Sequence, residues 1–160
     1  MNCLLSECAH IVNGLAPIAD AFAGTVYSDV IDVSEAHGLS FLVWSGVGAT
    51  GTSTITVEAC DDTTPTTTSA VAFKSQRVSN HQSSDVPGAV TARAAAGFDT
   101  TAGSNQIYLI HVDPQAIAAT GYRYARLKMV EVVDSPVLGG ILAILHHLRV
   151  QRATPLSAID

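Results

Sequence analysis

The sequence predicts an all-β protein, an antiparallel β-sandwich or barrel of the jelly-roll kind, and three observations lead to this fold class. Several short segments alternate apolar and polar residues, as strands with one buried face do. Turn-forming residues separate these segments at short intervals. Almost no helical segments intervene, which argues against the βαβ units of a parallel sheet. The 160 residues are expected to divide into an N-terminal arm (1–24), a β domain (25–148) and a C-terminal tail (149–160).

The first segment, residues 1–24, is predicted as a helical or extended arm. Its apolar residues recur at intervals of three, four and seven, which is helical spacing. Gly14 and Pro17 interrupt the pattern, so two short helical pieces or an ordered extended arm fit it as well as one helix. The arm either packs on its own domain or reaches a neighbouring subunit. Its candidate interface anchors are Leu4, Leu15, Ile18 and Phe22.

The first strands of the β domain are predicted before residue 61. Residues 25–33 and 54–60 alternate apolar with polar side chains, so each is expected to bury one face. Residues 39–47 are continuously apolar and include Trp44, as is typical of a strand buried on both faces. The glycine-rich residues 46–51 are expected to join the last two strands as a hairpin.

The later strands are predicted at residues 70–78, 106–112, 122–133 and 137–148. A Thr-rich loop precedes the first of these, and residues 79–101 are expected to form a long loop with one short strand. Asp113 as N-cap and Pro114 at the first helical position predict a helical turn that Gly121 ends. Two adjacent glycines in the last segment would cost a helix about 1 kcal/mol each, which favours a strand there.

The composition excludes some functions. Eight Lys and Arg stand against fourteen Asp and Glu, a net charge of −6, whereas nucleic-acid binding needs a basic face. Residues 1–73 contain no Lys or Arg, whereas residues 74–160 carry a net charge of +2. This asymmetry reflects chance, head-to-tail complementarity between subunits, or a weakly basic end that docks on an acidic partner. Only 14% of residues are charged and two are lysines, as in a subunit packed against others. No apolar run or leader pattern predicts a membrane span or export.

Two motifs would indicate catalysis or a cofactor in another context. Residues 46–51 match the G-x-G-x-x-G pattern, but a dinucleotide site needs a helix N-terminus after it, and a strand is expected here. Nucleophilic catalysis needs Ser or Cys beside His and a carboxylate, and the sequence has no G-x-S-x-G motif. We therefore expect no catalytic residue and no cofactor, and the protein is predicted not to be an enzyme.

The cysteines and histidines form no metal-ligand pattern. Cys3, Cys8 and His10 are close in sequence, but a closed zinc site takes four ligands and no fourth is evident. His146 and His147 are expected to point to opposite faces of a strand, so they cannot share a metal ion. Three cysteines without a framework spacing predict reduced thiols, and no metal site is expected.

Three blocks of the sequence resemble, in order and spacing, recurring segments of small virion proteins of tailed bacteriophages. They are GVGATGTSTITVEACDDTTP, GFDTTAGSNQIYLIHVDPQAI and GYRYARLKMVEVVDSPVLGGILAIL. The resemblance covers about residues 37–148 and includes neither the arm nor the tail. None of the blocks is a catalytic signature, so the resemblance implies a structural, capsid-associated role.

The leading hypothesis is a non-enzymatic capsid decoration (cement) protein that bridges major capsid subunits. It is expected to form homo-oligomers, with a trimer favoured, on the outer capsid surface after synthesis in the bacterial cytoplasm. The acidic charge fits an outer position because it would repel packaged DNA. The four arm residues named above and a docking strip from Arg149 to Arg152 in the tail are the candidate contacts.

Two alternatives stay open. A tail, head–tail joining or fibre-associated phage protein would fit the same sequence, and copy number per particle would separate it from a decoration protein. A carbohydrate-binding or hydrolytic β-sandwich is less favoured, because one Trp and four Tyr are few aromatic platforms for sugars.

Overall fold

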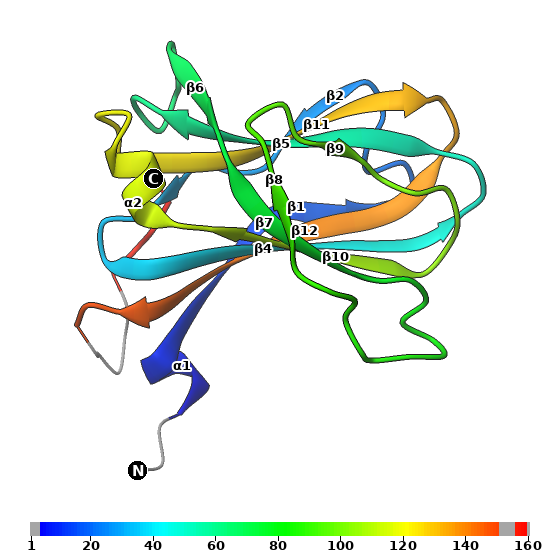
Figure 1. Ribbon diagram of the computed structural model, residues 1–160, viewed down its shortest axis with the longest axis horizontal. Coiled ribbons are helices and arrows are strands. Elements are labelled where there is room, and N and C mark those ends of the chain that lie inside the picture. Colours follow the sequence, from blue (N-terminus) through cyan, green and yellow to red (C-terminus); the bar gives the residue numbers. More distant parts are fainter. Residues whose placement is uncertain (1–3, 151–155, 160) are drawn as a thin grey trace.

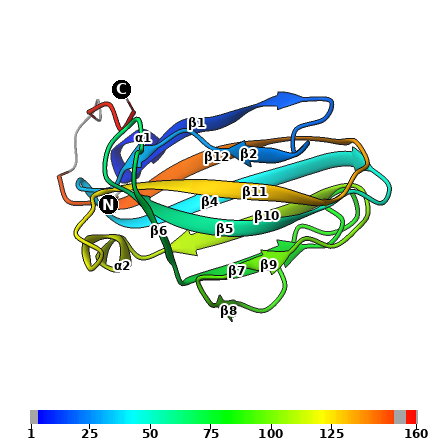
Figure 2. The ribbon, with the colours of Figure 1, turned by 90° about the horizontal axis from the view of Figure 1, so that it is seen from above.

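Alternating apolar residues build two antiparallel sheets that pack face to face in the computed structural model, which describes residues 4–150 and 156–159 (Figures 1 and 2). Sheet A has the order β1 (Ala9–Ile18), β12 (Val137–Leu148), β4 (Ala36–Gly48), β10 (Gln106–Val112), β7 (Phe73–Val78) and β8 (Thr91–Arg93). Sheet B has the order β2 (Thr25–Tyr27), β11 (Tyr124–Val133), β5 (Thr52–Cys60) and β6 (Thr68–Val71), with β3 (Ile31–Asp32) beside β11 and β9 (Phe98–Asp99) beside β5.

The chain crosses between the two sheets after most of its long strands. β1 and β12, the first and last strands, are neighbours in sheet A. β4 and β5 follow each other in sequence but lie in different sheets. The described strand pairs are all antiparallel. This arrangement confirms the predicted all-β sandwich, and its strand order is that of a double-sheet jelly roll.

The core lies between the inner faces of the two sheets. Ala125, Leu127 and Met129 of β11 face it, as the alternation predicts. Other fully buried side chains include Leu39, Phe41 and Val43 of β4, Ile55 and Val57 of β5, and Ile110 of β10. Burying one side chain of this size contributes about 1.5–3 kcal/mol to folding, so this layer holds the sheets together.

The N-terminal segment belongs to the sandwich, which corrects the arm predicted over residues 1–24. Within residues 4–24, only α1 (Leu5–Cys8) is helical, and the ten residues of β1 pair along β12. Phe22 is buried in the core. Two register shifts interrupt the alternation of β1, so its apolar residues take on a spacing that imitates a helical stripe.

The strand boundaries correct four further expectations, and in three of them the chain changes sheet. Residues 46–51 do not close a hairpin, because β4 and β5 lie in different sheets. Residues 70–78 form the end of β6 and then β7, again one in each sheet. Residues 25–33 form two short strands, and residues 79–101 hold two short strands where one was expected. Local alternation does not show where a strand leaves its sheet.

The helical turn after β10 forms as its residues predict. In α2 (Pro114–Ala118), the Asp113 carboxylate accepts the backbone N–H of Gln115 over 2.9 Å. Gly121 follows with a φ of 86°, a left-handed conformation that favours glycine. Neither α1 nor α2 has the length that crossing a membrane requires.

The described end of the tail also packs on the sandwich. Ala158 is buried, and its carbonyl oxygen accepts the backbone N–H of Asp32 over 2.8 Å.

Cys8 is disulfide-bonded, which corrects the expectation of reduced thiols. Cys60 is a buried free thiol, and burial raises its pKa to about 11. A thiol held protonated in this way is not a nucleophile.

Candidate interaction surface

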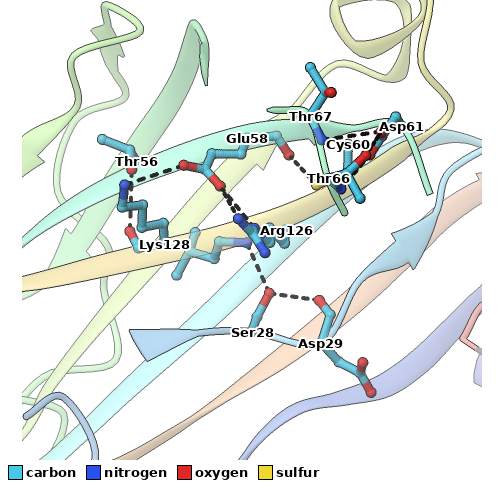
Figure 3. Close-up of polar contacts among 11 residues, drawn as sticks. Ser28, Asp29, Thr56, Glu58, Cys60, Asp61, Thr66, Thr67, Arg126 and Lys128 are labelled. Carbon is cyan, nitrogen blue, oxygen red and sulfur yellow. Dashed lines mark hydrogen bonds and ion pairs between the residues drawn. The ribbon is translucent and has the colours of Figure 1, made fainter. Parts of the chain in front are cut away.

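The outer face of sheet B carries a closed polar network (Figure 3). Glu58 of β5 forms an ion pair with Arg126 of β11, in which Arg126 Nη2 lies 2.7 Å from Glu58 Oε2. Lys128 Nζ lies 3.5 Å from Glu58 Oε1. The guanidinium of Arg126 also lies 3.9 Å from the ring centroid of Tyr27. The one carboxylate thus pairs with two cations of the adjacent strand. Sheet B therefore has the ordinary polar outer face of an antiparallel sheet.

The outer face of sheet A is apolar instead. Its adjacent strands β1, β12, β4 and β10 contain no Asp, Glu, Lys or Arg. Their outward side chains form rows across the sheet; Leu142, Leu42 and Leu109 are direct cross-strand neighbours. We call this surface the apolar face of sheet A, and it consists of Ile11, Leu42, Trp44, Ile107, Leu109, Leu142 and Ile144.

This face corrects the prediction that residues 39–47 are buried on both sides. Leu39, Phe41 and Val43 are fully buried in the core, but Trp44 on the other side is 46% exposed. Leu142 on the neighbouring strand is 40% exposed. The apolar sequence of β4 is thus typical of a strand covered on both faces, but in the single chain only one face is covered. Contiguous apolar surface of this kind marks interaction sites.

A hollow of about 350 Å³ lies in the apolar face beside Trp44. Leu15 and Pro17 of β1 form one side of it, and Leu142 lies on β12, between β1 and β4. Gly140 of β12 is the direct cross-strand partner of Trp44. A Cβ on Gly140 would lie 2.9 Å from the Leu15 carbonyl oxygen, so only glycine fits under β1 here.

Trp44 is held at the rim of this hollow by a residue far along the chain. Its indole Nε1–H donates to His81 Nε2 over 2.8 Å. The two rings are tilted, with their centroids 5.8 Å apart. Because the one polar atom of the indole is satisfied, the exposed part of the ring offers apolar surface without an unpaired donor.

A row of hydrogen-bonded histidines closes one end of the apolar face. Ser40 Oγ lies 2.9 Å from His111 Nδ1 and 3.0 Å from His146 Nε2. His111 Nε2 lies 3.1 Å from Gln76 Oε1, and His146 Nδ1 lies 2.8 Å from His147 Nδ1. The amide oxygen of Gln76 only accepts hydrogen bonds, so His111 Nε2 carries the proton that it receives. With all three histidines neutral, one choice of tautomers then gives every hydrogen bond in the row one donor and one acceptor.

The contact between the last two histidines corrects the expectation that they point apart. His147 has a φ of 52°, which breaks the alternation of β12 and turns its ring towards His146. The ring of His146 covers Gly38 of β4, where a Cβ would lie 2.1 Å from the imidazole. Burial lowers the pKa of His146, and the neighbouring His147 and His111 lower it further. The pKa of His111 is lowered by burial first and then by Lys74.

The hydrogen-bond partners of this row are neutral groups. Among the described residues, the hydrogen bonds of Ser40, His111 and His146 join them to one another, to Gln76 and to His147, and none of these partners is a carboxylate. Within residues 4–150 and 156–159, no cluster of three or more His, Cys, Asp or Glu could hold a metal ion. Cys3, considered with Cys8 and His10, lies outside the described residues. The row keeps the end of the apolar face neutral.

The residues predicted as interface anchors do not gather in one place. Leu4 is exposed beside α1, at the end of the sandwich where α1 projects in Figure 1. Ile18 is exposed at the end of β1, and Leu15 packs on the core margin and lines the hollow. Phe22 is a core residue, so its assignment as a surface anchor is wrong.

The tail residues are placed only in part. Arg149 is exposed, and its backbone N–H donates to the Glu35 carbonyl oxygen over 2.9 Å. Arg152 lies outside the described residues. Sequence reasoning missed the apolar face itself, although the absence of charge from four strands and the continuous apolar run around Trp44 were its signals.

Comparisons with known proteins give little further guidance. No protein-family model matches the chain, and no curated protein matches it. A search of solved structures finds the crystal structure of the SPBc2 prophage-derived protein YomS, with 12% sequence identity and a TM-score of 0.45 over 86% of this chain and 91% of that chain.

Proposed function

We propose that this protein is a non-enzymatic structural component of a bacteriophage virion, which works by packing against neighbouring subunits of the shell. The observation that carries the proposal is the apolar face of sheet A. Exposed apolar area costs about 25 cal/mol per Å² relative to burial, so covering this face drives association. The three sequence blocks that resemble small phage virion proteins indicate the setting in which such a face is covered.

Within the virion, the proposed role is decoration of the outer capsid, where copies bridge major capsid subunits. A rigid sandwich suits a clamp, because its two sheets keep a contact surface in shape without ordering costs on binding. Weak contacts repeated over many copies add avidity across the particle. The exposed side chains of Leu4, Ile18 and Arg149 remain candidates for the contacts with capsid subunits.

A tail, head–tail joining or fibre-associated role is the second reading of the same surfaces. Both roles use the apolar face for packing between subunits, and they differ in the number of copies per particle. Decoration requires copies on the scale of the capsid lattice, whereas joining structures use rings of few subunits. Counting copies per particle separates them.

The test is binding of the purified protein to phage particles that lack it. We expect saturable binding, a copy number on the scale of the capsid lattice, and density for the sandwich on the outer shell in a particle reconstruction. Leu142→Asp, which places a charge on the apolar face, should reduce the bound amount, and Thr56→Asp on the polar face of sheet B should not. Absence of the chain from purified virions would refute the proposal.

A further inference from the structure

The apolar face of sheet A has the features of a self-complementary interface. A two-fold interface uses the same patch on both copies, so that patch must carry both a protrusion and a depression. Trp44 is the protrusion, exposed and held by His81, and the hollow of about 350 Å³ between β1 and Trp44 is the depression. We propose that a second copy of this chain covers the face, sheet A against sheet A, with Trp44 of each copy in the hollow of the other.

The electrostatics of the face favour a second copy over a partner of opposite charge. Each chain carries a net charge of −6. If the face carried charges of one sign, a two-fold contact would bring like charges from the two copies together, and they would repel. The four strands of the face contain no charged residue, so self-association buries no like charges. The acidic residues of the chain lie outside these four strands.

The histidine row meets the same requirement at one end of the face. Ser40, His111, His146 and His147 bond to one another, and the neutral assignment leaves their shared bonds satisfied. A neutral row can be covered by a second copy without stranding a charge. The exposed Lys74 of β7 pairs with His111 across the strands and lies at the margin of the face.

The size of the face is sufficient for association. Four strands spaced by about 4.8 Å and about eight residues long give a surface of about 500 Å² in projection. Two such faces bury about 1,000 Å², the lower range of specific protein interfaces. Sheets that pack in this way stand about 10 Å apart, which is the depth that Leu42, Leu109 and Leu142 from each copy can fill.

This inference deepens the proposed function and rests on it for the virion setting. Its test uses the purified protein alone and does not depend on that function. Analytical ultracentrifugation over a wide concentration range should show a dimer or a higher assembly of dimers. Leu142→Asp should raise the dissociation constant by roughly 30-fold or more, which is the effect of losing a central contact. Thr56→Asp, on the outer face of sheet B, is the matched control and should leave it unchanged. Thermal melting checks that each variant is folded.

Trp44 gives a second readout, because it is the one tryptophan in the chain. Association should shift its emission to shorter wavelength and protect it from acrylamide. A chain that stays monomeric at all concentrations, or a Leu142→Asp variant that associates as wild type, overturns the inference. If Trp44 is protected only when the protein binds particles, the face belongs to a capsid subunit; the inference then fails while the proposed function stands.

Discussion

Trp44 on β4 and His81 in the loop after β7 are joined by one hydrogen bond, from the indole Nε1–H to the imidazole Nε2 over 2.8 Å. The two residues are 37 positions apart in sequence. The bond fixes the orientation of the largest exposed side chain of the apolar face and occupies its only donor. A loop that otherwise lies outside the sheets thus sets the shape of the proposed interface.

We expect His81→Ala to release the Trp44 ring while the protein stays folded. A single hydrogen bond of this kind contributes about 0.5–1.5 kcal/mol, so the melting temperature should fall only slightly. The near-ultraviolet circular dichroism of Trp44 should weaken, and self-association should become weaker. His37→Ala, at an exposed site on the same strand, is the control. An unchanged tryptophan spectrum in His81→Ala would show that the bond does not hold the ring.

Phe22→Ala should destabilise the domain strongly. The side chain is 5% exposed in the core, and removing a buried phenylalanine costs about 3–5 kcal/mol. Ile18→Ala, only four residues earlier and 51% exposed, should change the free energy of unfolding by about 0.5 kcal/mol or less. Urea denaturation measures both. Deletion of residues 1–24 should abolish cooperative unfolding. A truncated domain that stays stable would show instead that these residues form a separate arm.

Glu58→Gln should destabilise the protein by about 1–3 kcal/mol, because it leaves Arg126 without its carboxylate partner in a largely buried pair. Asp32→Asn removes a pair with Arg123, whose side chain is 62% exposed, and should cost less than about 1 kcal/mol. Chemical denaturation at neutral pH compares the two variants. Equal effects would mean that the Glu58 network adds no more than a surface pair.

Acidification should destabilise the fold through His111 and His146. The fold lowers the pKa of both below the ordinary value of 6.5, so the unfolded chain binds protons more readily than the native one. Their contribution to stability is therefore complete above pH 6.5 and is lost as the pH falls from there through the lowered pKa values. The melting temperature followed from neutral to mildly acidic pH tests this.

The paired variant His111→Gln with His146→Gln separates these two residues from the other titrating groups. It should show a smaller loss of stability over the same pH range than the wild-type protein, although its stability at neutral pH is lower because the row through Ser40 is broken. An unchanged pH dependence in the variant would place the acid-sensitive groups elsewhere, most simply among the carboxylates.

Local patterns were reliable where one strand obeys one rule. The alternation in β5 and β11 predicted which side chains face the core, and Asp113-Pro114 with Gly121 predicted the helical turn. The N-terminal segment failed because two register shifts in β1 replaced alternation by a spacing close to that of a helix. The adjacent histidines failed for a related reason, since the positive φ of His147 turns its ring back towards His146.

The sequence by itself determined the all-β class, the strands β5, β10, β11 and β12, and the uncharged character of the segments that became β1, β4, β10 and β12. Only the tertiary structure decided that these four strands are neighbours in one sheet and that Phe22 closes the core rather than reaching outward. The reason is physical: alternation fixes which side of a strand is apolar, but strand order depends on contacts between residues far apart in sequence. The exposure of Trp44 beside its hollow follows from that order alone.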